Sequence, residues 1–261
     1  MPENPIIQVR GLSKSYGKKQ VLNNIDLEVL AGQVIGYIGT NGAGKSTTVR
    51  IMTGLDNDFQ GEVIVNGINV KENPLEVKKV IGYIPEVAEL YDVLTPMEYL
   101  DLIGKLHGLD EATIQTRATN MLGQFGLSEN LNQRMDTFSK GMRQKVLIVS
   151  GLIHNPQIIF LDEPLTGLDA NTVIMVKEII ARLAEEGKTI FYCSHMMDVV
   201  EKVSHRIVLL KHGRIIADGS FEELQKQGDE SLESVFSQLT GSEDSSTKVD
   251  DFLGSIKDAD E

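Results

Sequence analysis

The sequence has a single cysteine and no long apolar segment. One cysteine, Cys193, excludes an internal disulfide and fits a reducing compartment. It closes the apolar run 190–193, so we expect a buried, unreactive thiol. No apolar run approaches the roughly 20 residues that a membrane-spanning helix needs. Residues 1–7 lack a basic segment followed by an apolar one, and we therefore expect no signal peptide.

The sequence also lacks an excess of basic residues. Its formal net charge is −13, of which twelve acidic residues and three lysines between Phe221 and Glu261 give −9, leaving −4 for the first 220 residues. A nearly balanced body gives little support to nucleic acid as a partner, because phosphate backbones are bound by basic faces. Residues 241–261 are rich in Ser, Asp and Glu, which predicts a solvated acidic tail. A short docking helix is the alternative, carried by Phe252, Leu253 and Ile256.

The most specific motif is the run GTNGAGKS at residues 39–46, which matches G-x-x-x-x-G-K-[ST]. It follows the strand-like segment 34–38 and opens the helix-like segment 46–52. Such a loop turns backbone N–H groups and a helix N-terminus toward an anion. We therefore predict a nucleoside triphosphate site in which Lys45 reaches the β and γ phosphates and the Ser46 hydroxyl ligates Mg²⁺. The residues expected to form this cradle are Gly39, Asn41, Gly42, Gly44, Lys45, Ser46 and Thr47.

The order of apolar patterns predicts an α/β fold. Residues 7–70 alternate like strands and include a two-residue hairpin signal at Asn66-Gly67. Residues 95–154 have helical spacing and open on a capping-box pattern at Thr95. Beyond them, short apolar runs suited to buried strands lie at 158–161, 189–194, 207–210 and 215–217, and a helical segment lies between the first two, at 172–186. We expect a P-loop NTPase core with a mostly parallel sheet wrapped by helices, an N-terminal antiparallel β subdomain and an inserted helical subdomain.

An acidic pair follows one of the expected strands. Asp162 and Glu163 come directly after the apolar run 158–161. Ligands of open α/β sheets bind at the carboxyl ends of the strands, where the Lys45 loop is also expected. Asp162 is therefore predicted to coordinate Mg²⁺, directly or through water, and Glu163 to act as the catalytic base. Kinases, GTPases, motors and transport ATPases share such loops, so the class stays open at this point.

The segment FSKGMRQ at residues 138–144 discriminates among these classes. Ser139 and the Gly141 amide, at a helix N-terminus, would form a second anion site, although the same pattern also describes a simple N-capped helix. Here the chain resembles the ATP-binding cassette (ABC) family, whose signature is usually LSGGQ. Phe138, Ser139 and Gly141 match, whereas Lys140 and Met142 depart. The resemblance implies a head-to-tail dimer that sandwiches two ATP molecules, each phosphate loop facing the other cassette's signature.

The resemblance implies roles for three further residues. Asp169 matches the D-loop, which crosses the dimer seam near the partner's site. His195, after the run ending at Ser194, matches the switch histidine that contacts the γ-phosphate and orients Glu163. Tyr16 matches the aromatic residue that stacks on adenine.

Glu86 is the weakest match to the family pattern. Residues 81–86 align with the loop that joins the core to the helical subdomain, where the family normally has glutamine in place of Glu86. A carboxylate oxygen of Glu86 can still ligate the metal, but the residue adds a negative charge and loses an amide donor. The expected metal ligands are thus Ser46, Asp162 and Glu86. A second acid also raises the question of which carboxylate deprotonates water, and we assign that role to Glu163.

The resemblance to the family extends over about residues 7–239. Within the family, segments 83–86, 138–142 and 235–241 look most like the bacterial ABC-2 type, whose members are commonly export systems. The resemblance implies an ABC ATPase domain at 1–240 followed by the tail at 241–261. Within that domain we expect the core and antiparallel β part at 6–85 and 156–220, and the helical subdomain at about 86–155.

The resemblance also implies partners. We expect a second ABC subunit, a separately encoded membrane permease whose coupling helix meets the loop near 86–95, and a location at the cytoplasmic face of the membrane. Two copies of this chain are favoured over a pair with a paralogue, but the sequence leaves both open. A cassette ATPase without a permease, as in cluster assembly, is the first alternative. A P-loop kinase or GTPase is the second, and the missing guanine-reading Asn-Lys-x-Asp and the second anion site at Ser139 argue against it.

Overall fold

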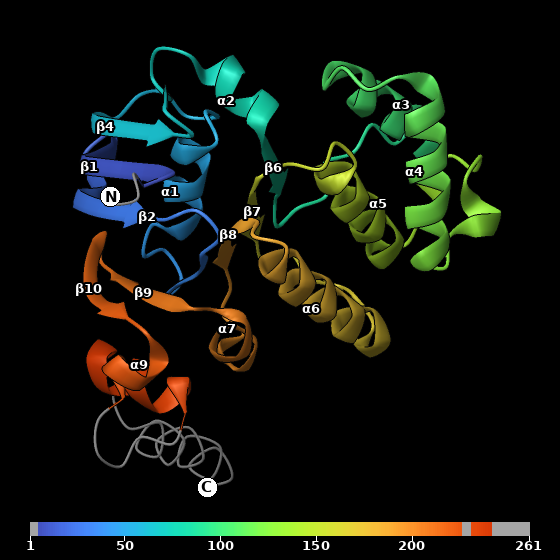
Figure 1. The fold of residues 1–261 in the computed structure, drawn as a ribbon. Coiled ribbons are helices and arrows are strands. Elements are labelled where there is room, and N and C mark those ends of the chain that lie inside the picture. The colour runs from blue at the N-terminus through green and yellow to red at the C-terminus, as the bar shows by residue number, and fades with distance from the viewer. Residues whose placement is uncertain (1–4, 226–230, 242–261) are drawn as a thin grey trace, which may run out of the picture.

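The computed structural model describes residues 5–225 and 231–241 and confirms the α/β class with its two kinds of sheet (Figure 1). The antiparallel sheet has the order β2-β1-β4-β5 and consists of β1 (Ile7–Tyr16), β2 (Lys19–Val29), β4 (Gln60–Val65) and β5 (Ile68–Asn69). The larger sheet has the order β10-β9-β3-β8-β7-β6 and consists of β3 (Val34–Gly39), β6 (Ile81–Ile84), β7 (Ile158–Asp162), β8 (Thr189–Cys193), β9 (Arg206–Lys211) and β10 (Arg214–Gly219).

The larger sheet is parallel from β9 to β6, and only β10 pairs antiparallel, with β9. Every residue of β3, β7 and β8 is buried. A strand covered on both faces carries an unbroken apolar run, which is why these segments lack alternation. Cys193, at the end of β8, is fully buried, as expected.

The helices cover the sheets and fill the segment between β6 and β7 (Figure 1). Their bounds are α1 (Lys45–Met52), α2 (Pro74–Val80), α3 (Pro96–Leu106), α4 (Glu111–Gln124), α5 (Lys140–Leu152), α6 (Ala170–Glu185), α7 (Met197–Val203), α8 (Phe221–Leu224) and α9 (Leu232–Thr240), with 3₁₀ turns η1 (Ser128–Asn130) and η2 (Met135–Thr137). None of the helices in the described ranges is long and apolar enough to cross a bilayer.

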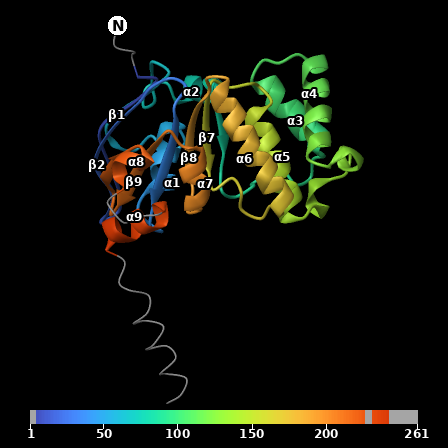
Figure 2. The same ribbon diagram turned by 60° about the horizontal axis from the view of Figure 1, so that its bottom comes forward.

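Two hydrophobic clusters lie on opposite faces of the larger sheet. On β3, Ile35 and Tyr37 face the cluster shared with α1 and the antiparallel sheet, whereas Val34 and Ile38 face the cluster formed with α3 to α7. Helix α1 therefore lies between the two sheets. Both views place α3 and α4 on the side of the molecule away from the antiparallel sheet (Figure 2).

Local sequence signals are confirmed where they were strongest. Asn66 and Gly67 adopt φ values of 52° and 75° and join β4 to β5 as the predicted hairpin turn. The capping box of α3 also forms, because the Glu98 amide donates to Thr95 Oγ1 (3.2 Å) and the Thr95 amide donates to Glu98 Oε2 (2.8 Å).

Two local expectations are wrong. Residues 81–84 were expected within a connecting loop but form β6, which pairs parallel with β7. Gly82 allows α5 to pack closely on this strand, since a Cβ there would lie 2.3 Å from the carbonyl oxygen of Gly151 in α5. Helix α6 begins at Ala170 rather than near residue 172, because Asp169 caps it. The division into subdomains stays a prediction, and the acidic tail lies outside the described residues apart from Gly241.

Candidate nucleotide-binding and active site

The loop between β3 and α1 has the backbone that its glycines permit. Gly42 and Gly44 lie in the left-handed region, with φ values of 76° and 113°. A Cβ on Gly44 would lie 2.5 Å from Leu22 Cδ2, and one on Gly39 would lie 2.4 Å from the Leu210 carbonyl oxygen. Glycine is therefore required both by conformation and by close approach.

Lys45 is the first residue of α1 and folds back over this loop. Its Nζ donates to the carbonyl oxygens of Gly39 (2.7 Å) and Thr40 (3.4 Å). Ser46, the next residue, is exposed. A lysine ammonium, a hydroxyl and the free N–H groups of a helix N-terminus thus gather at one point, an arrangement suited to binding phosphate.

A cavity of about 750 Å³ opens beside the loop and collects most of the predicted site residues. Its lining consists of Tyr16, Lys19, Val21, Asn41, Gly42, Gly44, Lys45, Ser46, Thr47, Glu86, Glu163 and His195. The phosphate loop, Glu163 and His195 converge because β3, β8 and β7 are neighbours in the sheet and end at the same edge, whereas Tyr16, Lys19 and Val21 come from β1 and β2. Lys19 and Val21 were not predicted from the sequence. Of the predicted residues, Gly39, Asp162, Ser139, Gly141 and Asp169 are not among those that line the cavity.

Asp162 ends β7 next to this cavity and is 3% exposed. Burial raises the pKa of its carboxyl group to about 6, and the nearby charges of Glu163 and Glu86 act in the same direction, against the opposing effects of Ser46 and Lys45. Its Oδ1 is buried and has no hydrogen-bond partner. Acidic groups are therefore concentrated around Asp162 Oδ1, a buried oxygen that is free to coordinate a cation or to accept a hydrogen bond.

Glu163 is held in an unusual conformation. Its φ of 51° is rare for a residue with a side chain, and its amide donates to the Cys193 carbonyl oxygen at 2.9 Å. Its Oε2 accepts from Ser194 Oγ (3.1 Å) and lies 2.9 Å from His195 Nδ1. Two residues at the end of β8 thus fix this carboxylate at the cavity wall. Ser194 was not predicted from the sequence, where its only signal was its position directly before His195.

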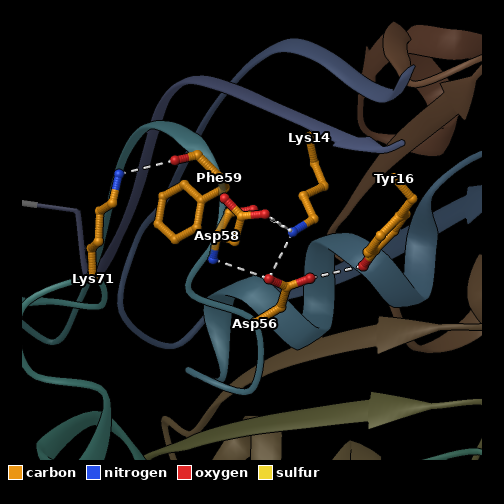
Figure 3. Close-up of polar contacts among 6 residues, drawn as sticks. All are labelled: Lys14, Tyr16, Asp56, Asp58, Phe59 and Lys71. Carbon is orange, nitrogen blue, oxygen red and sulfur yellow. Dashed lines mark hydrogen bonds and ion pairs between the residues drawn. The ribbon is translucent and has the colours of Figure 1, made fainter. Parts of the chain in front are cut away.

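Tyr16 ends β1 and is 48% exposed at the cavity. Its hydroxyl donates to Asp56 Oδ2 (2.8 Å), and Lys14 Nζ lies 4.8 Å from its ring centroid (Figure 3). Neither Lys14 nor Asp56 was predicted from the sequence.

Ser139, Gly141 and Asp169 lie at helix starts on α5 and α6. Ser139 caps α5, its Oγ accepting from the Met142 amide at 3.2 Å, and its side chain remains exposed. Gly141 packs so closely that a Cβ there would lie 2.9 Å from the Gly167 carbonyl oxygen. This close contact explains why position 141 is a glycine, which the sequence alone did not indicate.

Asp169 caps α6, accepting from the Thr172 amide (2.9 Å) and the Thr172 hydroxyl (2.6 Å). These two bonds lower the pKa of the Asp169 carboxyl group to about 2, with a smaller contribution from Lys145, whose Nζ lies 3.5 Å away.

The fold and the cavity define a P-loop NTPase, with a phosphate loop after β3 and an acidic pair at the end of the nearby strand β7. A family model described as ABC transporter matches residues 22–166. The chain belongs to this family and is an ATP-binding cassette ATPase.

Curated relatives support the assignment over most of the chain. The chain is 38% identical over 224 residues to the ABC transporter ATP-binding protein NatA of Bacillus subtilis, covering 84% of this chain and 91% of NatA. It is 34% identical over 219 residues to the linearmycin resistance ATP-binding protein LnrL of the same organism, covering 84% and 70%.

Solved structures agree in fold. An ATP-binding subunit of an ABC transporter superposes with a TM-score of 0.84 at 32% identity, over 90% of this chain and 99% of that one. A dimeric ATP-binding cassette in a post-hydrolysis state, bound to ADP and Pi, superposes with a TM-score of 0.77 at 26% identity, over 82% of this chain and 98% of that one.

Proposed function

We propose that this chain hydrolyses Mg²⁺-bound ATP at the interface of two cassettes and powers a separately encoded permease in export. The observation that carries the proposal is a single cavity lined both by the phosphate loop with Lys45 and by the linked pair Glu163 and His195. One half of that lining suits phosphate binding, and the other suits activation of water.

The residues present fit Mg²⁺. The buried Asp162 Oδ1 has no protein partner, and Ser46 and Glu86 bring oxygen ligands to the adjoining cavity. Among the described residues, no three His, Cys, Asp or Glu side chains gather to hold a metal by themselves. This suits Mg²⁺, which takes one or two carboxylates and completes its shell with water and substrate phosphates. Once bound, the ion would offset charge on the β and γ phosphates.

Glu163 is the proposed base for the attacking water. Ser194 and His195 both contact its Oε2, which fixes the carboxylate and leaves its other oxygen to accept a proton. Lys45 and the loop N–H groups would bind the phosphates whose negative charge grows during the reaction. Glu86 lines the same cavity, so its carboxylate is the competing candidate for the base.

The second cassette completes the site in this proposal. Ser139 and Gly141 of one copy would face the γ-phosphate bound to the other, with Asp169 near the seam. The dimeric cassette with ADP and Pi is 26% identical to this chain, which supports a dimer. We propose two identical copies.

A membrane partner would meet the loop at residues 86–95. This loop exposes the apolar side chains Val87, Tyr91 and Val93 by 61%, 63% and 64%. Exposed apolar side chains gathered in one loop are typical of an interaction surface. NatA and LnrL are named as transporter and resistance ATP-binding proteins, which supports a permease partner, export and a location at the cytoplasmic face of the membrane. Co-purification with a multi-span membrane protein distinguishes this proposal from a cassette without a permease.

Replacement of Glu163 by Gln tests the catalytic assignment. We expect E163Q to bind ATP normally but to lose at least about a hundredfold in hydrolysis, because the amide cannot take the proton of water. Phosphate release and ATP titration measure the two properties. The matched control is E76Q, at an exposed position of α2, which should keep wild-type turnover. Retention of hydrolysis by E163Q would transfer the role of base to another group, and E86Q in the same assay would identify it.

A further inference from the structure

A charged network lies beside Tyr16 and meets its hydroxyl group (Figure 3). The Tyr16 hydroxyl donates to Asp56 Oδ2 at 2.8 Å. The other carboxylate oxygen, Asp56 Oδ1, accepts from Lys14 Nζ at 2.9 Å and from the Asp58 amide at 3.1 Å. Lys14 also donates to the Asp58 carbonyl oxygen and lies 3.4 Å from Asp58 Oδ2. Both carboxylate oxygens of Asp56 therefore accept hydrogen bonds, and one of them accepts from the tyrosine.

The centre of the network is buried, whereas the side chains of Asp58 and Tyr16 are exposed at its two ends. The side chains of Lys14 and Asp56 are 4% and 13% exposed, whereas Tyr16 is 48% exposed and lines the cavity. A buried ion pair with several hydrogen bonds has few alternative arrangements. The hydroxyl end of Tyr16 is thus fixed by an inflexible group, and its ring remains accessible to a ligand.

The network also connects two parts of the nucleotide site. Lys14 and Tyr16 belong to β1, whereas Asp56 follows α1, the helix that begins at Lys45. The Asp56 amide donates to the Arg50 carbonyl oxygen of α1 at 3.1 Å. The tyrosine ring is therefore tied to the phosphate-loop helix as well as to its own strand.

The protonation states favour this arrangement. Burial alone would raise the pKa of Asp56, but hydrogen bonds from Lys14 and Tyr16 outweigh it and lower that pKa. Partial burial and the bond to Asp56 raise the pKa of Tyr16. At neutral pH the carboxylate is thus an acceptor and the phenol a donor.

We propose that Asp56, held by Lys14, is a positioning residue that orients the Tyr16 ring for stacking on the adenine of ATP. This inference rests on the proposed ATP site. It gives the Tyr16 hydroxyl the role of anchoring the ring to Asp56, which a phenylalanine could not do. Asp56 acts through Tyr16 and need not touch the nucleotide.

The test compares ATP with inorganic tripolyphosphate, which has no base to stack. Isothermal titration with Mg²⁺ present gives both affinities for the wild type, Y16F and D56A. We expect Y16F and D56A to weaken ATP binding about threefold to tenfold, the effect of one lost hydrogen bond, and to leave tripolyphosphate binding unchanged. The Y16F/D56A double variant should bind ATP no more weakly than the weaker single variant, because both changes remove the Tyr16–Asp56 bond.

Y16F is the decisive variant, because it leaves the Lys14–Asp56 pair intact, whereas D56A removes the carboxylate partner of the buried Lys14. Thermal melting separates loss of fold from loss of positioning. The matched control D101N breaks an Asp–Lys pair on α3 and should leave both affinities unchanged.

Wild-type ATP affinity in Y16F, with a loss in Y16L, would overturn the positioning role while leaving the stacking role in place. An equal loss for both ligands in Y16F would also overturn it. K45A should lose both ligands, and if it does not, the ATP site itself is wrong.

Discussion

At the scale of single residues, His154 links α5 to the edge strand β6. Its Nε2 donates to the Ile81 carbonyl oxygen at 2.9 Å, and its ring stacks on His107 with centroids 3.6 Å apart. Its Nδ1 is buried without a hydrogen-bond partner. Burial lowers the pKa of His154 to about 4, helped by the charges of His107 and Arg117. The folded protein therefore holds this imidazole neutral.

This lowered pKa predicts acid sensitivity. His154 takes up a proton near pH 6.5 in the unfolded chain, but only near pH 4 in the folded chain. The free energy of unfolding is therefore at its full value above about pH 6.5 and falls as the pH drops toward 4, by about 1–2 kcal/mol between pH 7 and 5. Urea denaturation at pH 7, 6 and 5 measures it. H154Q keeps an amide donor for Ile81 and should flatten the dependence, whereas the exposed-site control H212N should not. Equal pH dependence in H154Q and the wild type would contradict this assignment.

At the scale of elements, α3 illustrates how local sequence signals set a boundary. Thr95 and Glu98 form both bonds of the capping box, and Pro96 occupies the first helical position. We expect T95A to lower the free energy of unfolding by about 1 kcal/mol, because the Glu98 amide loses its acceptor. Urea denaturation measures the change. T116A, at an exposed position within α4, is the control and should not destabilise. A T95A protein as stable as the wild type would show that packing alone fixes this helix start.

Elements with such local signals were predictable from the sequence. The phosphate loop, the Asn66-Gly67 hairpin and the α3 cap each depend on a few adjacent residues. Strand β6 was missed because its four residues pair only with β7, far along the chain. The start of α6 was misplaced because Asp169 was interpreted only by its resemblance to the D-loop, although it is also an N-cap.

The site was predictable to a similar extent. Ten of its predicted residues line one cavity, since the motif after β3 and the residues after β7 and β8 all end at the same edge of a parallel sheet. The support behind these residues was not predictable. Asp56 lies 40 positions from Tyr16, and Ser194 lies 31 from Glu163, so only the folded chain brings these partners together.

At the scale of the whole molecule, the groups proposed to bind phosphate are divided between two places. The cavity contains Lys45 and Glu163, whereas Ser139 caps α5 and remains exposed outside that lining. An exposed helix N-terminus with a capping serine is suited to an anion that another molecule brings. The proposed dimer supplies that anion as the γ-phosphate of the other copy.

A change of charge at position 139 tests whether Ser139 faces the γ-phosphate of the other copy, and it leaves the helix cap in place. Asp and Asn both cap helices as well as Ser does, so S139D and S139N should keep the wild-type melting temperature. We expect E163Q to form dimers with ATP and Mg²⁺, E163Q/S139N to retain them, and E163Q/S139D to lose them, because the added carboxylate faces phosphate. Size-exclusion chromatography with light scattering, with and without ATP, measures the mass. Since the two double variants differ only in charge, equal dimerisation by both would place the γ-phosphate away from Ser139 and contradict the proposed sandwich.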